Sequence, residues 1–129
     1  MSIGRSGGEG GIFGILSVQI ESNNSVDNGG GVYVYEGTFT MQGGNISKNN
    51  AARDGGGIYV SSGPFVQDGG GISGNTATRD GGGVFIRSFG EVFIDDNAEY
   101  FGNMAARAYR LEASHEDKES DPGVSIAII

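Results

Sequence analysis

The chain has 129 residues, of which 26 are glycine, two are proline and none is cysteine. Sixteen acidic residues against eight basic ones give a formal net charge of −8, which argues against binding to nucleic acid or to an anionic membrane surface. Without cysteine the chain has no disulfide and no thiolate metal site, and no run of about 18 apolar residues predicts a membrane span.

A repeat of 26 residues organises the middle of the sequence. The segment at 28–34 reads NGGGVYV, and it returns as DGGGIYV at 54–60 and as DGGGVFI at 80–86. A fixed period of this length is typical of stacked repeats, in which each unit buries its apolar side only against its neighbours. We therefore expect one domain over residues 1–129, with regular coils over 28–107.

Residues 1–27 precede the regular repeat and predict an irregular N-terminal coil. A shift of 26 residues places Phe13 in line with Phe39, which leaves only residues 5–8 for the first strand of this coil. A second alignment makes residues 11–15 that first strand, in a shortened coil. The sequence does not decide between the two alignments.

One unit of the repeat contains three short runs with strand character, at 32–34, 38–41 and 45–47. Each run is rich in β-branched or aromatic residues and is bounded by glycine or asparagine, and none is long enough to predict a helix. We expect three strands per coil and about four coils of 26 residues. Equivalent residues should then stack at the parallel-strand spacing of about 4.8 Å.

This register aligns apolar residues of successive coils in columns. Residues two apart in a strand face the same side, so the columns are expected to face inward. They consist of Val32, Ile58 and Val84; Val34, Val60 and Ile86; Phe39, Phe65 and Val92; and Ile20, Ile46, Ile72 and Tyr100.

The segments 54–60 (DGGGIYV) and 72–77 (ISGNTA) resemble the Gly-rich repeats of bacterial surface and adhesin-like proteins. The resemblance covers roughly residues 16–107 and implies an all-β fold, the right-handed parallel β-helix or β-solenoid. Proteins with such repeats serve as adhesins, as autotransporter passengers and as polysaccharide-active enzymes, so the resemblance is specific for fold and weak for function.

Asparagine recurs once per coil at a corner of the predicted solenoid, at Asn23, Asn49, Asn75 and Asn103. An inward asparagine at this place predicts a ladder of amides that bond to the coils above and below and to the backbone of the turn. Ligand binding by exposed amides is the alternative interpretation.

Three aromatic residues, Tyr33, Tyr59 and Phe85, alternate with the inward residues and should therefore lie outside, stacked on one another. Such a row stabilises a parallel sheet, and its alternative role is contact with the sugar rings of surface glycans.

Basic and acidic residues are predicted to form neighbouring columns, with Arg53, Arg79 and Arg107 beside Asn28, Asp54 and Asp80. Exposed ion pairs contribute only about 0–1 kcal/mol each. Rows of arginine and carboxylate also occur in polysaccharide lyases, which is the less favoured interpretation here because the repeat explains both columns without catalysis.

The period breaks after residue 107. An alanine-rich segment at 104–113 predicts a short helix, and residues 108–120 predict an excursion from the solenoid. Residues 121–129 should return as a C-terminal strand that starts a new coil, in which Val124, Ile126 and Ile128 alternate.

We expect a structural protein, outside the cell or at its surface, that binds itself head to tail and grows into filaments. Neither a catalytic site, a metal site nor a cofactor is expected. The open alternatives are a surface adhesin or carbohydrate-binding module, and a fragment of a longer solenoid. The residues expected at the assembly interface are Val124, Ile126 and Ile128 of the C-terminal strand and Ile12, Phe13 and Ile15 near the N-terminus.

Overall fold

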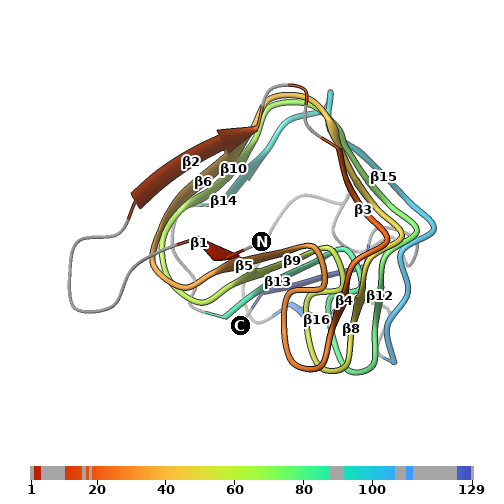
Figure 1. The fold of residues 1–129 in the computed structure, drawn as a ribbon. Helices are drawn as coiled ribbons and strands as arrows, with labels where there is room; N and C mark the ends of the chain where they lie inside the picture. The colour runs from red at the N-terminus through yellow and green to blue at the C-terminus, as the bar shows by residue number, and fades with distance from the viewer. Residues whose placement is uncertain are drawn as a thin grey trace.

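The structure is a computed structural model that describes residues 2–3, 11–15, 17, 19–87, 92–106, 110–111 and 125–128. All regular structure in these segments is β, and the strands stack as a parallel β-solenoid, which confirms the predicted fold class. Figure 1 looks along the stack, so that successive coils lie one behind another. About three full coils are present, against about four predicted.

Two parallel sheets form the first and second sides of the solenoid. Sheet A has the strand order β1 (Ser2–Ile3), β5 (Val32–Val34), β9 (Ile58–Val60), β13 (Val84–Ile86), β17 (Ile126–Ile128) and β16 (Arg110–Leu111). Sheet B has the order β2 (Gly11–Ile15), β6 (Gly37–Met41), β10 (Phe65–Gln67) and β14 (Val92–Ile94).

The third side and a short fourth strand complete each coil. Sheet C has the order β3 (Gln19–Glu21), β7 (Asn45–Ser47), β11 (Gly71–Ser73) and β15 (Glu99–Phe101). Sheet D has the order β4 (Asn24–Ser25), β8 (Asn50–Ala51) and β12 (Thr76–Ala77). The fourth strand was not predicted, because a run of two residues shows no alternation that a sequence pattern can reveal.

The predicted columns are confirmed by the strand register. Val32 lies beside Ile58, Ile58 beside Val84, and Phe65 lies between Phe39 and Val92. The inward side chains of sheets A, B and C form one apolar core, in which the fully buried residues are Val32, Val34, Phe39, Met41, Ile46, Ile58, Val60, Phe65, Ile72, Val84, Ile86, Ile126 and Ile128. Burial of these columns between coils provides the main driving force for stacking.

The N-terminal coil decides between the two sequence alignments. Strand β2 pairs with β6 and places Phe13 beside Phe39, so the alignment that made residues 11–15 a first-side strand is wrong. The first-side strand is β1, in which Ser2 lies beside Tyr33, so the expectation that residues 5–8 fill this place is also wrong. The physical reason is a longer connection in this coil, since paired residues are 31 positions apart there.

The C-terminal segment returns to sheet A as predicted, but its strands are arranged differently. Strand β17 pairs with β13, with Ile126 beside Val84, and β16 pairs with the other side of β17. Residues 110–111 are therefore an edge strand, and Met104 forms a bridge with Thr76, so the predicted helix over 104–113 is wrong. Helix propensity was overridden by hydrogen bonding to an available sheet edge.

Candidate functional site

A thin lobe projects from one corner of the solenoid, where Figure 1 labels β4, β8 and β12. We call it the glycine lobe; it consists of residues 24–31, 50–57 and 76–83, one segment from each coil. Each segment leaves the core along its sheet D strand, turns, and returns along the three glycines of the repeat. The glycine run therefore forms the wall of the lobe opposite sheet D.

Glycine is required in this wall because two backbones pack directly on each other. A Cβ atom on Gly56 would lie 2.5 Å from the carbonyl oxygen of Thr76 and 2.4 Å from that of Gly82. The first glycine of each run adopts a left-handed conformation, as shown by the φ of +70° at Gly55. The repeated glycines thus let the two backbones of the lobe pack directly on each other, beside the small buried side chains of Ala51 and Ala77.

The asparagine ladder predicted at the corner between sheet C and the lobe is present. The Asn49 amide nitrogen donates to Asn75 Oδ1 at 3.0 Å and to the Ile20 carbonyl at 3.0 Å, and the Asn49 backbone N–H donates to the same Asn75 oxygen at 2.9 Å. Asn23 and Asn103 continue the ladder in the same direction. Asn49, Asn75 and Asn103 are buried, so the ladder is part of the framework rather than an exposed row of amides.

The aromatic row stacks as predicted, with Tyr33 on Tyr59 at 5.1 Å between ring centroids and Tyr59 on Phe85 at 5.2 Å. The planes are nearly parallel, at 9° and 2°. The expectation that the row is exposed is wrong for Tyr59 and Phe85, which are buried. Tyr59 and Phe85 are only 6% and 5% exposed, because the row lies in the corner between sheet A and the glycine lobe. Burial raises the pKa of the Tyr59 hydroxyl, while the charge and hydrogen bond of Arg87 act in the opposite direction.

The charged columns form two described ion pairs. Arg79 Nη2 lies 3.6 Å from Asp54 Oδ2, and Arg53 Nε lies 3.5 Å from Asp27 Oδ1. Both arginine side chains are more than half exposed, so these pairs contribute little stability. Arg107, the third arginine of the predicted column, lies outside the described residues.

The side chains predicted for assembly lie in two places. Ile126 and Ile128 are fully buried in the core of their own chain, on a strand that is paired on both sides. Residues 12, 13 and 15 lie on β2, which ends sheet B. Val124 lies outside the described residues. The two groups are therefore not brought together within one chain.

An apolar group on the last coil was missed by the sequence analysis. Phe93, Phe101 and Met104 are 53%, 62% and 67% exposed. Their columns contain polar or smaller residues in the coils before: Thr40 and Val66, Ser47 and Ser73, and Asn50 and Thr76. These exposed apolar residues could have been found by comparing the outward-facing residues of successive coils as well as the inward-facing ones.

Two depressions border the glycine lobe. One, of about 420 Å³, lies along its side and is lined by Asn28, Arg53, Asp54, Tyr59, Arg79, Phe85 and Arg87. The other, of about 560 Å³, lies at the N-terminal end of the lobe and includes Asp27, Asn28, Gly29, Gly30 and Tyr33. The sequence analysis did not identify either depression, because both depend on the lobe that it missed.

Neither a metal-ion site nor a membrane-spanning helix occurs in the described part of the chain. Within it, no three His, Cys, Asp or Glu side chains form a group that could hold a metal ion. The same residues contain no helix with the length and apolar character needed to cross a membrane.

No protein family model matches the chain, and neither does a curated protein or a solved structure.

Proposed function

We propose that the protein is a structural solenoid that binds further copies of itself end to end, outside the cell or at its surface. The observation that supports this function is the exposure of large apolar side chains on the last coil, at the strands that end sheets B and C. Strands β14 and β15 end sheets B and C, and Phe93 and Phe101 extend outward from them. Large apolar side chains are thus exposed on the outer faces of two sheets in the last coil, and such exposure is typical of an interaction surface.

A second copy is the occupant that fits this end. Strands β2 and β3 end the same two sheets on the N-terminal side, so a second copy in the same orientation would continue both sheets. This requires β17 and β16 of the first copy to leave the places in sheet A that β1 and β5 of the second copy would take. In continued register Phe93 would lie beside Gly14 of that copy, where the strand has no side chain of its own. An aromatic ring over an edge glycine stabilises such a pair of strands. The contact is heterologous and therefore grows in one direction.

The route of assembly differs from the sequence-based expectation in one respect. Strand β17 already lies between β13 and β16 of its own chain, so it offers no free edge while the chain has this structure. The proposed contact therefore uses the coil ends, with β14 and β15 of one copy against β2 and β3 of the next.

The test compares the wild-type chain with the double variant Phe101→Ser/Met104→Thr, which carries the residues of the preceding coil at both positions. Sedimentation velocity over a wide concentration range measures association. We expect the wild type to associate as its concentration rises. The dissociation constant of the variant should be at least about tenfold higher, because two exposed apolar side chains are removed.

The matched control is Tyr35→Ser, because Tyr35 is 53% exposed but lies on an earlier coil. This variant should associate like the wild type. A wild-type chain that stays monomeric at the highest concentration, or a double variant that associates unchanged, overturns the proposal. Electron micrographs separate linear polymers from closed dimers, and closed dimers would exclude the head-to-tail geometry.

Glycan binding along the whole aromatic row is the second function considered, and the ring geometry does not favour it. Sugars pack against ring faces. In this row the faces of Tyr59 are covered by Tyr33 and Phe85, and Ala127 packs beside the other face of Phe85. Any ligand contact with the row is therefore restricted to its N-terminal end.

A further inference from the structure

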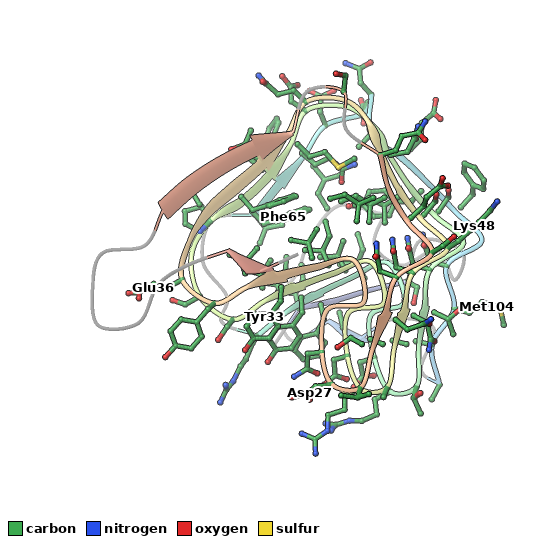
Figure 2. All side chains as sticks on the ribbon, in the orientation of Figure 1. Asp27, Tyr33, Glu36, Lys48, Phe65 and Met104 are labelled. Carbon is green, nitrogen blue, oxygen red and sulfur yellow. The ribbon has the colours of Figure 1, made fainter. Side chains whose placement is uncertain are left out.

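The N-terminal end of the glycine lobe combines features that no other described surface shares. Here the depression of about 560 Å³ is bordered by the ring of Tyr33, the carboxylate of Asp27 and the backbone of Gly29 and Gly30. Figure 2 shows Tyr33 in the corner between sheet A and the lobe, and Asp27 on the turn of the lobe.

The peptide groups of the glycine run all point the same way. The N–H of Gly29 donates to the Asp54 carbonyl at 3.0 Å and the N–H of Gly30 to the Gly55 carbonyl at 3.0 Å, both in the next coil. The following coil repeats this pattern, with Gly56 donating to Gly81 at 2.9 Å. Peptide dipoles usually alternate along a strand and cancel, whereas here they add along the solenoid axis, as they do in a helix.

The two ends of this column of peptides differ. At the C-terminal end, Ser125 accepts hydrogen bonds from the N–H groups of Gly82 and Gly83, at 2.8 and 2.9 Å. At the N-terminal end, no donor among the described residues reaches the carbonyl oxygens of Gly29 and Gly30. The N-terminal end of the lobe therefore carries partial negative charge and acceptors for hydrogen bonds.

The groups around these carbonyls also favour a positively charged ligand. Asp27 adds a carboxylate, which is exposed and shared with Arg53. The half-buried ring of Tyr33 stacks on Tyr59 with one face and lines the depression, next to Ser2 of β1. Carbonyl oxygens, a carboxylate and the face of a phenol ring all attract a cation that can donate hydrogen bonds.

We propose that this depression binds a protonated primary amine. The amine donates to the Gly29 and Gly30 carbonyl oxygens and lies against the part of the Tyr33 ring that lines the depression. An amino sugar and a lysine side chain share this chemistry. The site does not require end-to-end association, and a second copy stacked on β2, β3 and β4 would close it.

The test is an NMR titration of the ¹³C-labelled chain at a concentration where it is monomeric. Glucosamine and glucose form a matched pair that differs by the amine, and n-butylamine represents the lysine side chain. We expect glucosamine and n-butylamine to shift the carbonyl signals of Gly29 and Gly30, and glucose to leave them in place. Tighter binding of glucosamine identifies an amino sugar, and equal binding identifies the amine alone.

The variant Tyr33→Leu should bind the amine about two- to fivefold more weakly, which is the size of a cation–π contact at an exposed site. Tyr33→Phe should bind like the wild type because it keeps the ring face, and it guards against loss of folding in the leucine variant. Tyr35→Leu lies outside the depression and is the control. Glucose binding as tightly as glucosamine, no shift at Gly29 and Gly30, or unchanged affinity in Tyr33→Leu overturns the proposal. The titration uses the monomeric chain, so its result does not depend on whether copies associate end to end. Each of the two proposals can therefore be disproved without the other.

Discussion

The asparagine ladder shows how a single residue type fixes the stacking of the coils. Asn75 is fully buried, and its amide nitrogen donates to the Ile46 carbonyl at 2.9 Å and to Asn103 Oδ1 at 3.0 Å. Its own Oδ1 accepts from the backbone and side-chain nitrogens of Asn49. One side chain therefore links three coils, and no apolar residue of the same size can satisfy the groups around it.

Replacement of Asn75 by alanine should lower the free energy of unfolding by about 3–5 kcal/mol, because buried donors and acceptors in all three coils lose their partner. Urea unfolding followed by circular dichroism measures the change. Asn23→Ala is the matched variant at the exposed end of the ladder, and it should cost about 1 kcal/mol or less. Equal losses in the two variants would contradict the assigned role of burial.

The buried hydroxyl of Tyr59 makes stability depend on alkaline pH. Burial raises its pKa above the ordinary value of 10.0, so the folded chain holds this proton more tightly than the unfolded chain does. The resulting stabilisation is fully present below about pH 10 and is lost as the pH rises through the folded pKa. Tyr59→Phe removes this loss while keeping the stacked ring.

Urea unfolding of the wild type and of Tyr59→Phe between about pH 9 and 11 tests this. We expect the wild-type free energy of unfolding to fall more steeply with pH than that of the variant. The other groups that titrate in this pH range are the same in both chains, so their contributions to the pH dependence cancel in the comparison. The prediction is wrong if both chains show the same dependence on pH.

At the scale of elements, the glycine lobe is an extension that the core does not require. Its two walls pack backbone on backbone, whereas the glycine of an edge strand such as β2 faces open space. A Cβ atom at Gly14 would lie 4.0 Å from the Thr40 carbonyl oxygen, whereas a Cβ atom at Gly56 would lie 2.4 Å from the Gly82 carbonyl oxygen. Glycines in this chain therefore differ in their tolerance to substitution.

Gly56→Ala should lower the free energy of unfolding by about 2–3 kcal/mol, since the backbone of the facing wall must move to admit a methyl group. Gly14→Ala should change it by less than about 0.5 kcal/mol, because the methyl group meets the Thr40 carbonyl oxygen only at the ordinary contact distance of 4.0 Å. Chemical unfolding of the two variants under the same conditions provides the measurement. A tolerated Gly56→Ala would show that the lobe opens without cost to the core.

At the scale of the whole molecule, the solenoid has a direction and two unlike ends. The C-terminal end carries the exposed rings of Phe93 and Phe101 and a serine cap on the glycine run. The N-terminal end carries the edges of β2 and β3 and the open carbonyls of the lobe. Unlike ends favour a contact that repeats in one direction over a symmetric pair. Ligand binding at the lobe would oppose that contact, since both use the N-terminal end.

The repeat alone determined the fold class, the inward columns and the asparagine ladder. A fixed period brings residues 26 positions apart side by side, and that relation needs no knowledge of how the chain bends. The stacking of Tyr33 on Tyr59 and of Tyr59 on Phe85 followed from the same arithmetic.

Only the tertiary structure decided what lies between and beyond the regular strands. The lobe arises because Gly56 allows close approach of the backbone of Thr76; the glycine recurs with the period, but the period does not show which backbone the glycine meets. The insertion of β17 between β13 and β16 reverses the order of strands along the chain, which depends on the free edge that β13 offers. Sequence period fixes which residues stack, whereas the ends and corners depend on which hydrogen-bonding edges remain for the chain to satisfy.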